Sequence, residues 1–402
     1  MKILVLNCGS SSIKYQFMEM DGEKVLAAGL LDKIGLGSST LAHRPAGRDK
    51  VVLTADIYDH TAGIEMVVAA LTSAEHGVVK SAAEIAAVGH RVVHGGEKFS
   101  ASAVIDEAVL QQLRDCIELA PLHNPPNLKG IEACTQIMPK TPQVAVFDTA
   151  FHQTMPPAAY MYALPYVLYQ RYGLRRYGFH GTSHFYVARE SARLLGKPME
   201  QVKVITCHLG NGASIAAVSE GKSVDTSMGF TPLEGLVMGT RCGDMDPAII
   251  LYLMAKEELT QGEANTLMNK HSGLQGLSGV SSDMRGIIGE MDLGNPRAQL
   301  AFDTYCYRVR KYIGAYTAAM GGVDALVFTA GVGENSWRVR EACCRGLDCL
   351  GLVLDQEKNR ACAAGTPGDV AAADARARIH VIPTNEELVI ARDTRDIVFG
   401  KG

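Results

Sequence analysis

Short runs of Val, Ile and Leu recur along the chain, and each run ends in a loop rich in glycine or polar residues. A short β-branched run bounded in this way is typical of a buried strand. Longer stretches between the runs predict helices, and strands that alternate with helices predict an α/β architecture. The strands are expected at residues 3–6, 85–88, 144–147, 202–207, 325–329 and 379–382, and the helices at 64–73, 106–119 and 296–320.

A weak internal repeat relates the two halves of the chain. Residues 3–17, ILVLNCGSSSIKYQF, align with residues 204–218, VITCHLGNGASIAAV, at an offset of 201 residues. Gly9 and Gly210 coincide, and a strand, a tight turn and a second strand agree in both copies. A chain of 402 residues is also too long for one ordinary core. We therefore predict two similar domains whose glycine-rich hairpin loops face each other across a cleft.

Composition narrows the class of protein. Hydrophobic residues make up 47% and charged residues 20% of the chain, which is normal for a globular protein. The net charge of −4, without any run of Lys or Arg, argues against nucleic-acid binding. The start, MKILVLNCGSSS, is not expected to be a signal peptide, and no apolar run has the length of a membrane span. The ten cysteines show no CxxC spacing, so buried free thiols in the cytoplasm are expected.

Three glycine-rich loops could hold phosphate. They are NCGSSSIK with Gly9 and Lys14, HLGNGAS with Gly210, Asn211 and Gly212, and AGVGENS with Gly331 and Gly333, which precedes a predicted helix. Glycine lets backbone N–H groups approach an anion closely. Each loop alone could be an ordinary turn, but three together favour a nucleotide. The chain lacks GxxxxGK[ST] and a GxGxxG after its first strand, which excludes a Walker-type NTPase and argues against a Rossmann dehydrogenase.

Several polar residues stand where they could act on an anion. Arg91 and Arg241 lie in loops with neighbouring glycines, and such arginines are typical anion clamps. His180 precedes a predicted helix and Asp148 ends a predicted strand; either could equally be a plain loop or turn residue. For that helix, the alternative is that Thr182 or Ser183 only caps its start. His180 and His184 might suggest zinc, but no third ligand is placed, and zinc is not expected.

The segment PTNEELVIARDT predicts a strand end followed by a helix. Thr384 and Glu387 have the spacing of a capping box at the start of this helix. That arrangement leaves Glu386 available for the water shell of Mg²⁺, which needs few carboxylates.

Eight segments resemble the acetate and butyrate kinase family, in the order in which that family has them. They are LVLNCGSSSIK, GHRVVHGG, FDTAFH, RYGFHGTSH, HLGNGAS, TSMGFTPLEGLVMGTRCGDMDP, FTAGVGENS and PTNEELVIARDT. The resemblance implies a duplicated, ribonuclease H-like α/β fold of the actin, Hsp70 and sugar kinase type, with the active site between two domains, and a homodimer. It places an N-terminal domain at residues 1–150, with a helix at about 385–402 packed back onto it, and a nucleotide-binding domain at 151–384.

The resemblance also implies the roles of individual residues. Asp148, His180, Arg91 and Arg241 would be catalytic, and Asn7 and Glu386 would hold Mg²⁺, with Mn²⁺ as a substitute. Arg91 would also bind the substrate carboxylate, and a small apolar pocket would consist of Val93, Leu122, Phe179 and Pro232. The residues implied to bind ATP or ADP are Lys14, His208, Leu209, Gly210, Asn211, Gly212, Asp283, Met284, Arg285, Gly331, Val332, Gly333, Glu334 and Asn335.

The implied reaction is reversible, direct in-line phosphoryl transfer from ATP to acetate. Acetate is already ionised at neutral pH, so it needs no general base. We therefore expect Asp148 to orient Arg91 or a water, and the cations to offset repulsion between two anions.

Three other functions are weighed against acetate phosphorylation. A propionate or butyrate kinase differs by a methylene worth roughly 0.8 kcal/mol when buried, and Val93 and Phe179 favour the smaller acid. A nucleotide-dependent binding module would need neither the arginine pair nor the apolar pocket. A sugar kinase would need carboxylates and amides for sugar hydroxyls in place of that pocket.

Overall fold

The computed structural model describes residues 1–362 and 365–400, and it divides into two compact units. The first unit comprises Met1–Phe151 and Asn385–Gly402, and the second comprises His152–Thr384. The last helix of the chain therefore belongs to the same unit as the first strand.

The first unit is built on an eight-stranded sheet in the order β5-β4-β3-β2-β1-β6-β8-β7. Strands β1 to β5 form an antiparallel meander, whereas β1, β6 and β8 run parallel. The strands are β1 (Lys2–Cys8), β2 (Ser12–Glu19), β3 (Lys24–Asp32), β4 (Ser39–Pro45), β5 (Val51–Ala55), β6 (Ala87–Val92), β7 (Ala103–Val104) and β8 (Gln143–Phe147).

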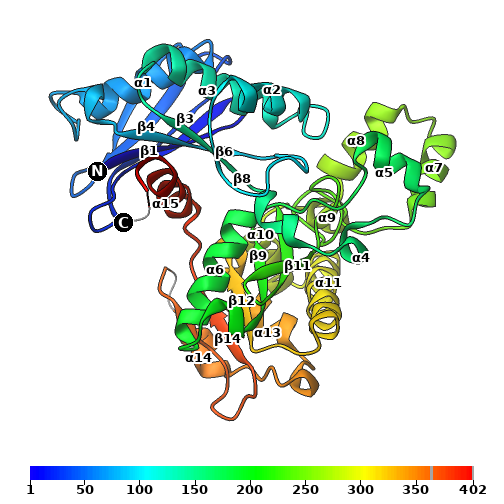
Figure 1. The fold of residues 1–402 in the computed structure, drawn as a ribbon. Helices are drawn as coiled ribbons and strands as arrows, with labels where there is room; N and C mark the ends of the chain where they lie inside the picture. Colours follow the sequence, from blue (N-terminus) through cyan, green and yellow to red (C-terminus); the bar gives the residue numbers. More distant parts are fainter. Residues whose placement is uncertain (363–364, 401–402) are drawn as a thin grey trace. The chain divides into compact units, whose positions relative to one another are not determined.

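Helices cover both faces of this sheet, as Figure 1 shows. One face carries α1 (His60–Thr72) and α3 (Asn124–Ile137), with α2 (Glu107–Asp115) beside α3, and the other carries α15 (Glu386–Phe399). Two glycines allow close packing. A Cβ on Gly89 of β6 would lie 2.4 Å from Thr394 Oγ1 of α15, and one on Gly130 of α3 would lie 2.4 Å from Cys8 Sγ.

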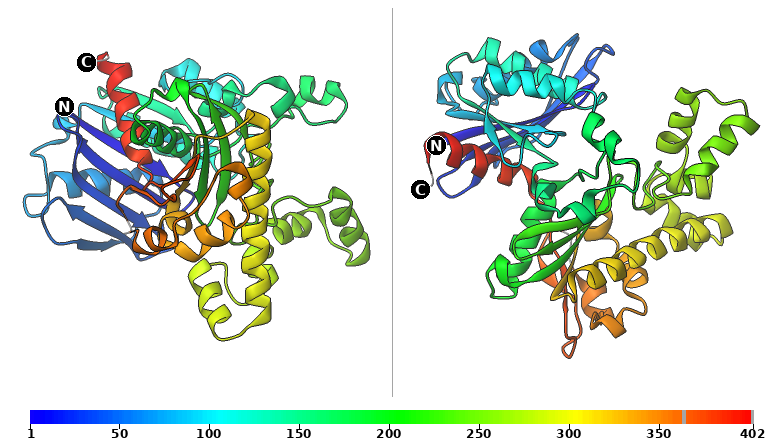
Figure 2. Two further views of the ribbon diagram at one scale, coloured as in Figure 1. Left: turned by 90° about the horizontal axis from the view of Figure 1, so that it is seen from below. Right: turned by 45° about the vertical axis from the view of Figure 1, so that its right-hand side comes forward.

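The second unit has a six-stranded sheet in the order β11-β10-β9-β12-β14-β13. Its strands are β9 (Lys203–Leu209), β10 (Ala213–Ser219), β11 (Lys222–Thr226), β12 (Ala325–Thr329), β13 (Gly368–Asp369) and β14 (Arg378–Val381). Helix α6 (Gly181–Leu194) packs on β9 and β12, and α11 (Pro296–Met320) packs on β9 and β10 from the opposite face (Figures 1 and 2).

Shorter helices surround this second sheet. They are α4 (Pro157–Tyr160), α5 (Tyr166–Tyr172), α7 (Pro247–Lys256), α8 (Gln261–Lys270), α9 (Gly273–Ser278), α10 (Met284–Asp292), α12 (Ala330–Asn335), α13 (Trp337–Cys344) and α14 (Gln356–Ala361). Single 3₁₀ turns occur at Ala82–Glu84, Ala150–Thr154, Met199–Gln201 and Asp348–Leu350.

The predicted duplication is confirmed by the two sheets. The strand series β3-β2-β1-β6-β8-β7 corresponds to β11-β10-β9-β12-β14-β13, with the same parallel and antiparallel pairings. The two hairpins differ at their turns. Cys8 pairs with Ile13 in the first, whereas Leu209 pairs with Ala213 in the second, so the second turn is one residue shorter than the alignment predicts.

Three predicted elements need correction. The strand expected at 85–88 is β6 (Ala87–Val92), so Arg91, which was expected in a loop, lies within a strand. The helix expected at 106–119 spans only Glu107–Asp115. Asp106 caps its start, because the Asp106 carboxylate accepts from Val109 N at 2.8 Å. Residues 331–335, expected as a loop, lie in the short helix α12.

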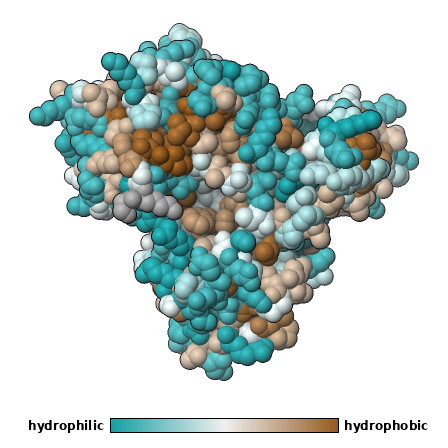
Figure 3. All heavy atoms as spheres, in the orientation of Figure 1, coloured by the Kyte–Doolittle hydropathy of each residue, from teal (hydrophilic) through white to brown (hydrophobic). Residues whose placement is uncertain are grey.

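The cysteines and the surface agree with a globular protein. All ten cysteines, which lie within the described residues, are free, and seven of them are buried as predicted. Cys349 is exposed, and Cys242 and Cys362 are half-buried. On the face drawn in Figure 3, hydrophilic residues predominate and hydrophobic ones gather in a few patches. Among the described helices, none has the length and hydropathy needed to span a bilayer.

Candidate active site

Arg91 and Asp148 form a two-pronged ion pair in the first unit. They come from neighbouring parallel strands, Arg91 from β6 and Asp148 directly after β8, so the strand ends bring them to one edge of the sheet. Arg91 Nη2 lies 2.5 Å from Asp148 Oδ2, and Arg91 Nε lies 3.1 Å from both carboxylate oxygens. The Asp148 side chain is 1% exposed and that of Arg91 is 21% exposed, so the pair holds a guanidinium whose outer edge remains accessible.

Two further carboxylates at the start of α15 extend this cluster. Glu386 Oε2 lies 4.0 Å from Arg91 Nε, and Glu387 forms an ion pair with Lys14 of β2. The predicted capping box is wrong. Asn385 caps α15 by accepting from Leu388 N at 3.1 Å, while Thr384 Oγ1 donates to Ser183 Oγ at 2.8 Å. Lys14 attracts Glu387 more strongly than the helix start does, because the pair carries full charges on both partners.

The charges in this cluster shift two pKa values. Burial opposes the charge of Arg91, but Asp148 and Glu386 more than offset that effect, so the pKa of Arg91 is raised. Burial raises the pKa of Glu386, and the nearby Asp148 and Glu387 add to the rise, although Arg91 opposes it. Glu386 is thus the carboxylate with the weakest cation partner in the cluster.

The predicted ligands Asn7 and Glu386 have the chemistry that Mg²⁺ requires. Asn7 of β1 stands opposite Lys14 in the β1–β2 pairing, and Lys14 contacts Glu387, the neighbour of Glu386. Amide and carboxylate oxygens suit Mg²⁺, which keeps most of its water shell. A divalent cation would offset the negative charge of the carboxylates around Glu386. Asn7 and Glu386 therefore fit the ion. Within the described residues, no group of three His, Cys, Asp or Glu side chains could hold a metal by itself.

Two asparagines that sequence reasoning missed hold the loop after β6. Asn127 of α3 accepts from Val93 N at 3.1 Å and donates to Cys8 O at 2.8 Å. Asn124 accepts from His94 N at 3.2 Å and donates to His94 O at 2.9 Å. Both side chains are buried, so they fix the backbone beside Arg91 without being exposed to a ligand. Asn124 before a proline suggests a helix start in the sequence. Nothing in the local sequence predicts that Asn124 and Asn127 bond to the backbone of distant residues.

His180 and His208 stack in the second unit, with ring centroids 4.2 Å apart. His180 has a φ of +57° at the position before α6, where its side chain makes no capping bond. Its Nδ1 lies 2.9 Å from Ser214 Oγ, which is also 2.7 Å from His184 Nε2.

The neighbouring hydroxyls have partners of their own in this cluster. Ser183 Oγ lies 2.7 Å from His208 Nδ1, so the alternative in which Ser183 merely caps α6 is wrong. His184 Nδ1 lies 2.7 Å from Thr206 Oγ1, so hydroxyls occupy both of its ring nitrogens. His184 therefore supports His180 through Ser214.

Arg241 lies beside this pair of rings. A Cβ on Gly212 would lie 3.4 Å from Arg241 Nη1 and 3.8 Å from His180 Cε1, so Gly212 leaves room between the two side chains. Arg241 Nη1 donates to Pro232 O at 3.2 Å, and within the described residues no carboxylate lies within 4.0 Å of its guanidinium. Burial lowers the pKa of Arg241. A half-buried guanidinium without a carboxylate is a suitable anion site.

A second set of residues that the sequence did not reveal holds the loop of Pro232 and Arg241. Glu234 accepts from Arg176 Nη2 at 2.7 Å and from the hydroxyl of Tyr162. The same Tyr162 hydroxyl accepts from Phe230 N at 2.9 Å, and Arg176 Nη1 donates to Thr226 O at 2.7 Å. Through Arg176, Glu234 is therefore tied to Thr226 of β11, and through Tyr162 it is tied to Phe230 at the start of the loop.

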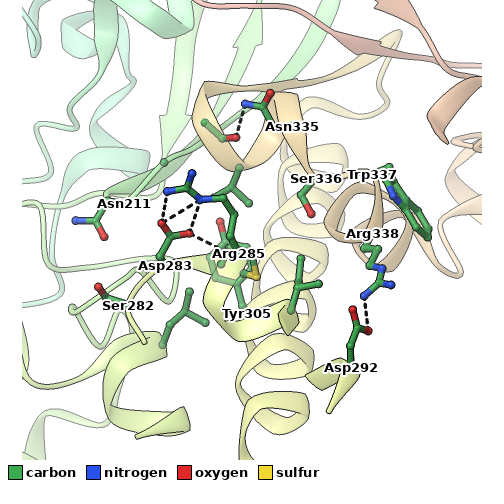
Figure 4. A pocket seen from close by; sticks show the side chains of 16 residues that line it. Asn211, Ser282, Asp283, Arg285, Asp292, Tyr305, Asn335, Ser336, Trp337 and Arg338 are labelled. Atoms are coloured by element: carbon green, nitrogen blue, oxygen red, sulfur yellow. Dashed lines mark hydrogen bonds and ion pairs between the residues drawn. The ribbon is translucent and has the colours of Figure 1, made fainter. Parts of the chain in front are cut away.

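A pocket of about 1200 Å³ opens in the second unit (Figure 4). A pocket of this size is large enough for a nucleotide. The predicted residues that line it are Gly210, Asn211, Asp283, Met284, Arg285, Gly331, Val332 and Asn335. Five other predicted residues of this unit, His208, Leu209, Gly212, Gly333 and Glu334, do not line it, and the predicted Lys14 belongs to the first unit. Leu209 is fully buried, and Glu334 instead accepts from Thr384 N at 3.2 Å.

The local structure fixes the positions of several side chains in this pocket. Asp283 caps α10 by accepting from Arg285 N at 2.8 Å, and its other oxygen lies 2.6 Å from Arg285 Nη2 (Figure 4). A Cβ on Gly239 would lie 2.1 Å from Asn211 Oδ1, so that glycine makes room for the asparagine. Lining residues that the sequence did not reveal are Leu274, Ser282, Ile288, Asp292, Tyr305, Ser336, Trp337 and Arg338.

The four residues of the predicted apolar pocket divide between the units. Val93 and Leu122 belong to the first, where Val93 is buried and Leu122 is 73% exposed. Phe179 and Pro232 belong to the second, where Phe179 is buried and Pro232 accepts from Arg241. Their joint pocket stays a prediction.

Known proteins resemble the chain over its whole length. The model of the Acetokinase family matches residues 2–392. The acetate kinase of Syntrophomonas wolfei is 59% identical over 98% of this chain and 99% of that protein. The acetate kinase of Heliobacterium modesticaldum is 59% identical over 100% of both.

Solved structures of the same kind of enzyme share the fold. The acetate kinase of Porphyromonas gingivalis superposes with a TM-score of 0.95 at 49% identity, covering 99% of both chains. A propionate kinase from Francisella tularensis superposes with a TM-score of 0.91 at 42% identity, covering 98% of this chain and 99% of the other.

Proposed function

The chain belongs to the acetokinase family, and we propose that it transfers a phosphoryl group reversibly between ATP and acetate, giving acetyl phosphate and ADP. It is a phosphotransferase with a carboxyl group as acceptor, of the fold that actin, Hsp70 and sugar kinases share. The observation that carries the substrate assignment is Arg241, a half-buried guanidinium with no carboxylate within 4.0 Å in the described part of the chain, beside His180.

The main barrier to this reaction is electrostatic, because a carboxylate must approach a polyphosphate. Arg91 supplies positive charge at the edge that Asp148 leaves accessible, and Arg241 supplies it beside His180. A carboxylate is already a nucleophile at neutral pH, so the geometry needs no general base. The two-pronged contact of Asp148 with Arg91 supports a role in orienting the guanidinium. It does not support a role for Asp148 as a general base.

His180 is suited to stabilise the transferring phosphoryl group in an in-line reaction. Its Nδ1 is held by Ser214, which His184 holds in turn, so the ring is fixed before substrate arrives. A hydrogen-bond donor that is held in place stabilises the negative charge that develops on the equatorial oxygens of the transferring phosphoryl group.

Asn7 and Glu386 would hold Mg²⁺, directly or through its waters. The ion would neutralise charge on the phosphates of the nucleotide. The nucleotide itself would lie in the pocket that Asn211, Asp283 and Asn335 line, with Lys14 near its phosphates.

A second candidate is propionate as the preferred acid, because a propionate kinase shares 42% of its residues with this chain. A single methylene changes kcat/KM by only about 10–200-fold, so the acids differ in degree. We favour acetate because the relatives at 59% identity are acetate kinases and because Val93 and Phe179 would narrow the acyl pocket.

The test is a hydroxamate assay with purified protein, ATP and Mg²⁺, run with acetate, propionate and butyrate. We expect the highest kcat/KM with acetate. A higher value with propionate would reassign the substrate, and no acyl phosphate from any of the three acids would refute the proposed function.

We also propose that the protein is a cytoplasmic homodimer. Ten free cysteines suit a reducing compartment. Helix α7 has no buried residue and exposes Ile249, Leu251 and Tyr252, which favours burial against a second copy. Light scattering should give twice the mass of one chain, and a monomer would refute this proposal.

A further inference from the structure

A second pocket, of about 430 Å³, lies between α11 and the end of α13. Asp303, Thr304, Cys306, Tyr307 and Arg310 of α11 line it together with Arg345, which follows α13. It is distinct from the nucleotide pocket, which other residues of the same two helices line, namely Tyr305 and Trp337. The proposed reaction uses none of its residues.

Positive charge without a carboxylate partner gathers at this pocket. In the described part of the chain, neither Arg310, Lys311 nor Arg345 has a carboxylate within 4.0 Å. Arg310 Nη1 donates to Arg345 O at 2.9 Å, which uses one of its five N–H groups. The Arg310 guanidinium and the Lys311 ammonium lie 5.7 Å and 5.9 Å from the centre of the Tyr307 ring. Arg310 and Arg345 line the pocket, and Lys311 is the chain neighbour of Arg310, so on a chain with net charge −4 these cations mark an anion site.

Asp303 adds a carboxylate to the same lining. It accepts from Gln299 Nε2 at 3.1 Å through Oδ2. An ionised carboxylate can only accept hydrogen bonds, so it repels an anion that carries no proton. A phosphate group that keeps one proton can instead donate that proton's hydrogen bond to Asp303 while its other oxygens accept from the arginines.

We propose that this pocket binds a protonated phosphate group, either inorganic phosphate or the phosphate of a small monoester. Arg310 and Arg345 bind the phosphate oxygens, and Asp303 selects against fully deprotonated anions of similar size. The volume exceeds that of a phosphate ion and leaves room for a small organic group.

Calorimetric titration of the full-length protein with inorganic phosphate, at constant ionic strength and with saturating ADP, tests the arginines. The double variant Arg310→Gln/Arg345→Gln should lose at least about tenfold in phosphate affinity, because each removes a charge-assisted hydrogen bond. The matched control Arg44→Gln/Arg48→Gln removes two exposed arginines of the first unit and should bind phosphate like the original protein. Equal phosphate affinity in the two double variants would overturn the proposal.

Sulfate tests the role of Asp303, since it matches phosphate in shape but has no proton at neutral pH. The original protein should bind phosphate about tenfold more tightly than sulfate, and Asp303→Asn should remove most of that difference. Equal binding of the two anions by the original protein would overturn the selection mechanism. Glycerol phosphate distinguishes the sources when it is titrated at about pH 5.5, where a monoester keeps one proton. Tighter binding than inorganic phosphate at that pH assigns the pocket to monoesters, and weaker binding assigns it to the free ion.

Discussion

Arg91 and Arg241 carry the same charge, but the structure gives them different partners. Asp148 binds Arg91 through Nε and Nη2, whereas among the described residues the Arg241 guanidinium donates only to the carbonyl of Pro232 and the sulfur of Met238. An arginine with a bound carboxylate is held in place, and one without it gains most from a bound anion. At the scale of single residues, we therefore assign orientation to the Arg91 pair and anion binding most directly to Arg241.

Replacing Arg241 by leucine tests this assignment. We expect kcat to fall by a factor on the order of 10³ or more, as when a phosphoryl-binding arginine is lost. Arg193→Leu, which removes an exposed arginine paired with Glu190 on α6, serves as the control and should leave kcat unchanged. A loss of only a few-fold in the Arg241 variant would contradict its role.

Replacing Asp148 by asparagine separates orientation from proton transfer. If Asp148 only holds Arg91, kcat should fall while its dependence on pH keeps its shape, because no titrating base is removed. The size of the fall should be roughly 10–100-fold, typical of losing a supporting partner. An enzyme that retains most of its kcat would exclude Asp148 from catalysis.

Sequence reasoning could identify charged residues in glycine-rich loops but not the partners that hold them. Arg91 was found because glycines flank it, although it lies within β6 and not in a loop, and Asp148 was found because it follows a strand. Asn127 and Glu234 were missed, because their partners lie 34 and 58 residues away in the chain, at Val93 and Arg176. Such pairs depend on the folded arrangement of elements, which no local spacing reveals.

At the scale of elements, the site residues lie at the ends of strands and at the turns of hairpins. The strand predicted at 325–329 and the helix predicted at 296–320 have the observed bounds, because strong apolar patterns and clear breakers define them. The helix expected at about 385–402 begins at Glu386, but its cap was predicted incorrectly, because Thr384 donates to Ser183 and Glu387 pairs with Lys14. Helix termini are decided by such competition between local and distant partners.

The loop from Gly229 to Arg241 offers a test at this scale. Glu234→Gln keeps the shape but removes the charge that Arg176 and Tyr162 bind. Because this loop carries Arg241, we expect kcat/KM for acetate to fall by up to about 10²-fold, while the KM for ATP changes little. Glu190→Gln, which removes a charge from a surface pair, is the matched control. Equal changes in both KM values would indicate general loss of structure instead.

At the scale of the whole molecule, both units repeat one strand order and both bury neutral histidines. Burial lowers the pKa of His90 and His94 in the first unit and of His152 in the second to about 4. Their ordinary pKa is near 6.5, so between pH 6.5 and pH 4 the unfolded chain binds more protons than the folded one. The free energy of unfolding should therefore fall as the pH falls through this range.

Urea unfolding at several pH values measures this effect. Each buried histidine contributes a slope of at most about 1.4 kcal/mol per pH unit. His90→Asn should reduce the slope, whereas Gln201→Asn, which changes an exposed side chain that does not titrate, should leave it unchanged. A midpoint that stays constant between neutral pH and pH 5 would contradict the linkage.

The central claim is that this chain joins a phosphoryl group to the carboxylate of acetate. Phosphorus NMR of the purified protein mixed with ATP, Mg²⁺ and acetate measures that bond directly. We predict that an acetyl phosphate signal grows as the γ-phosphate signal of ATP declines, and that acetyl phosphate with ADP restores ATP. If the γ-phosphate appears only as inorganic phosphate, or remains on ATP, the claim is contradicted.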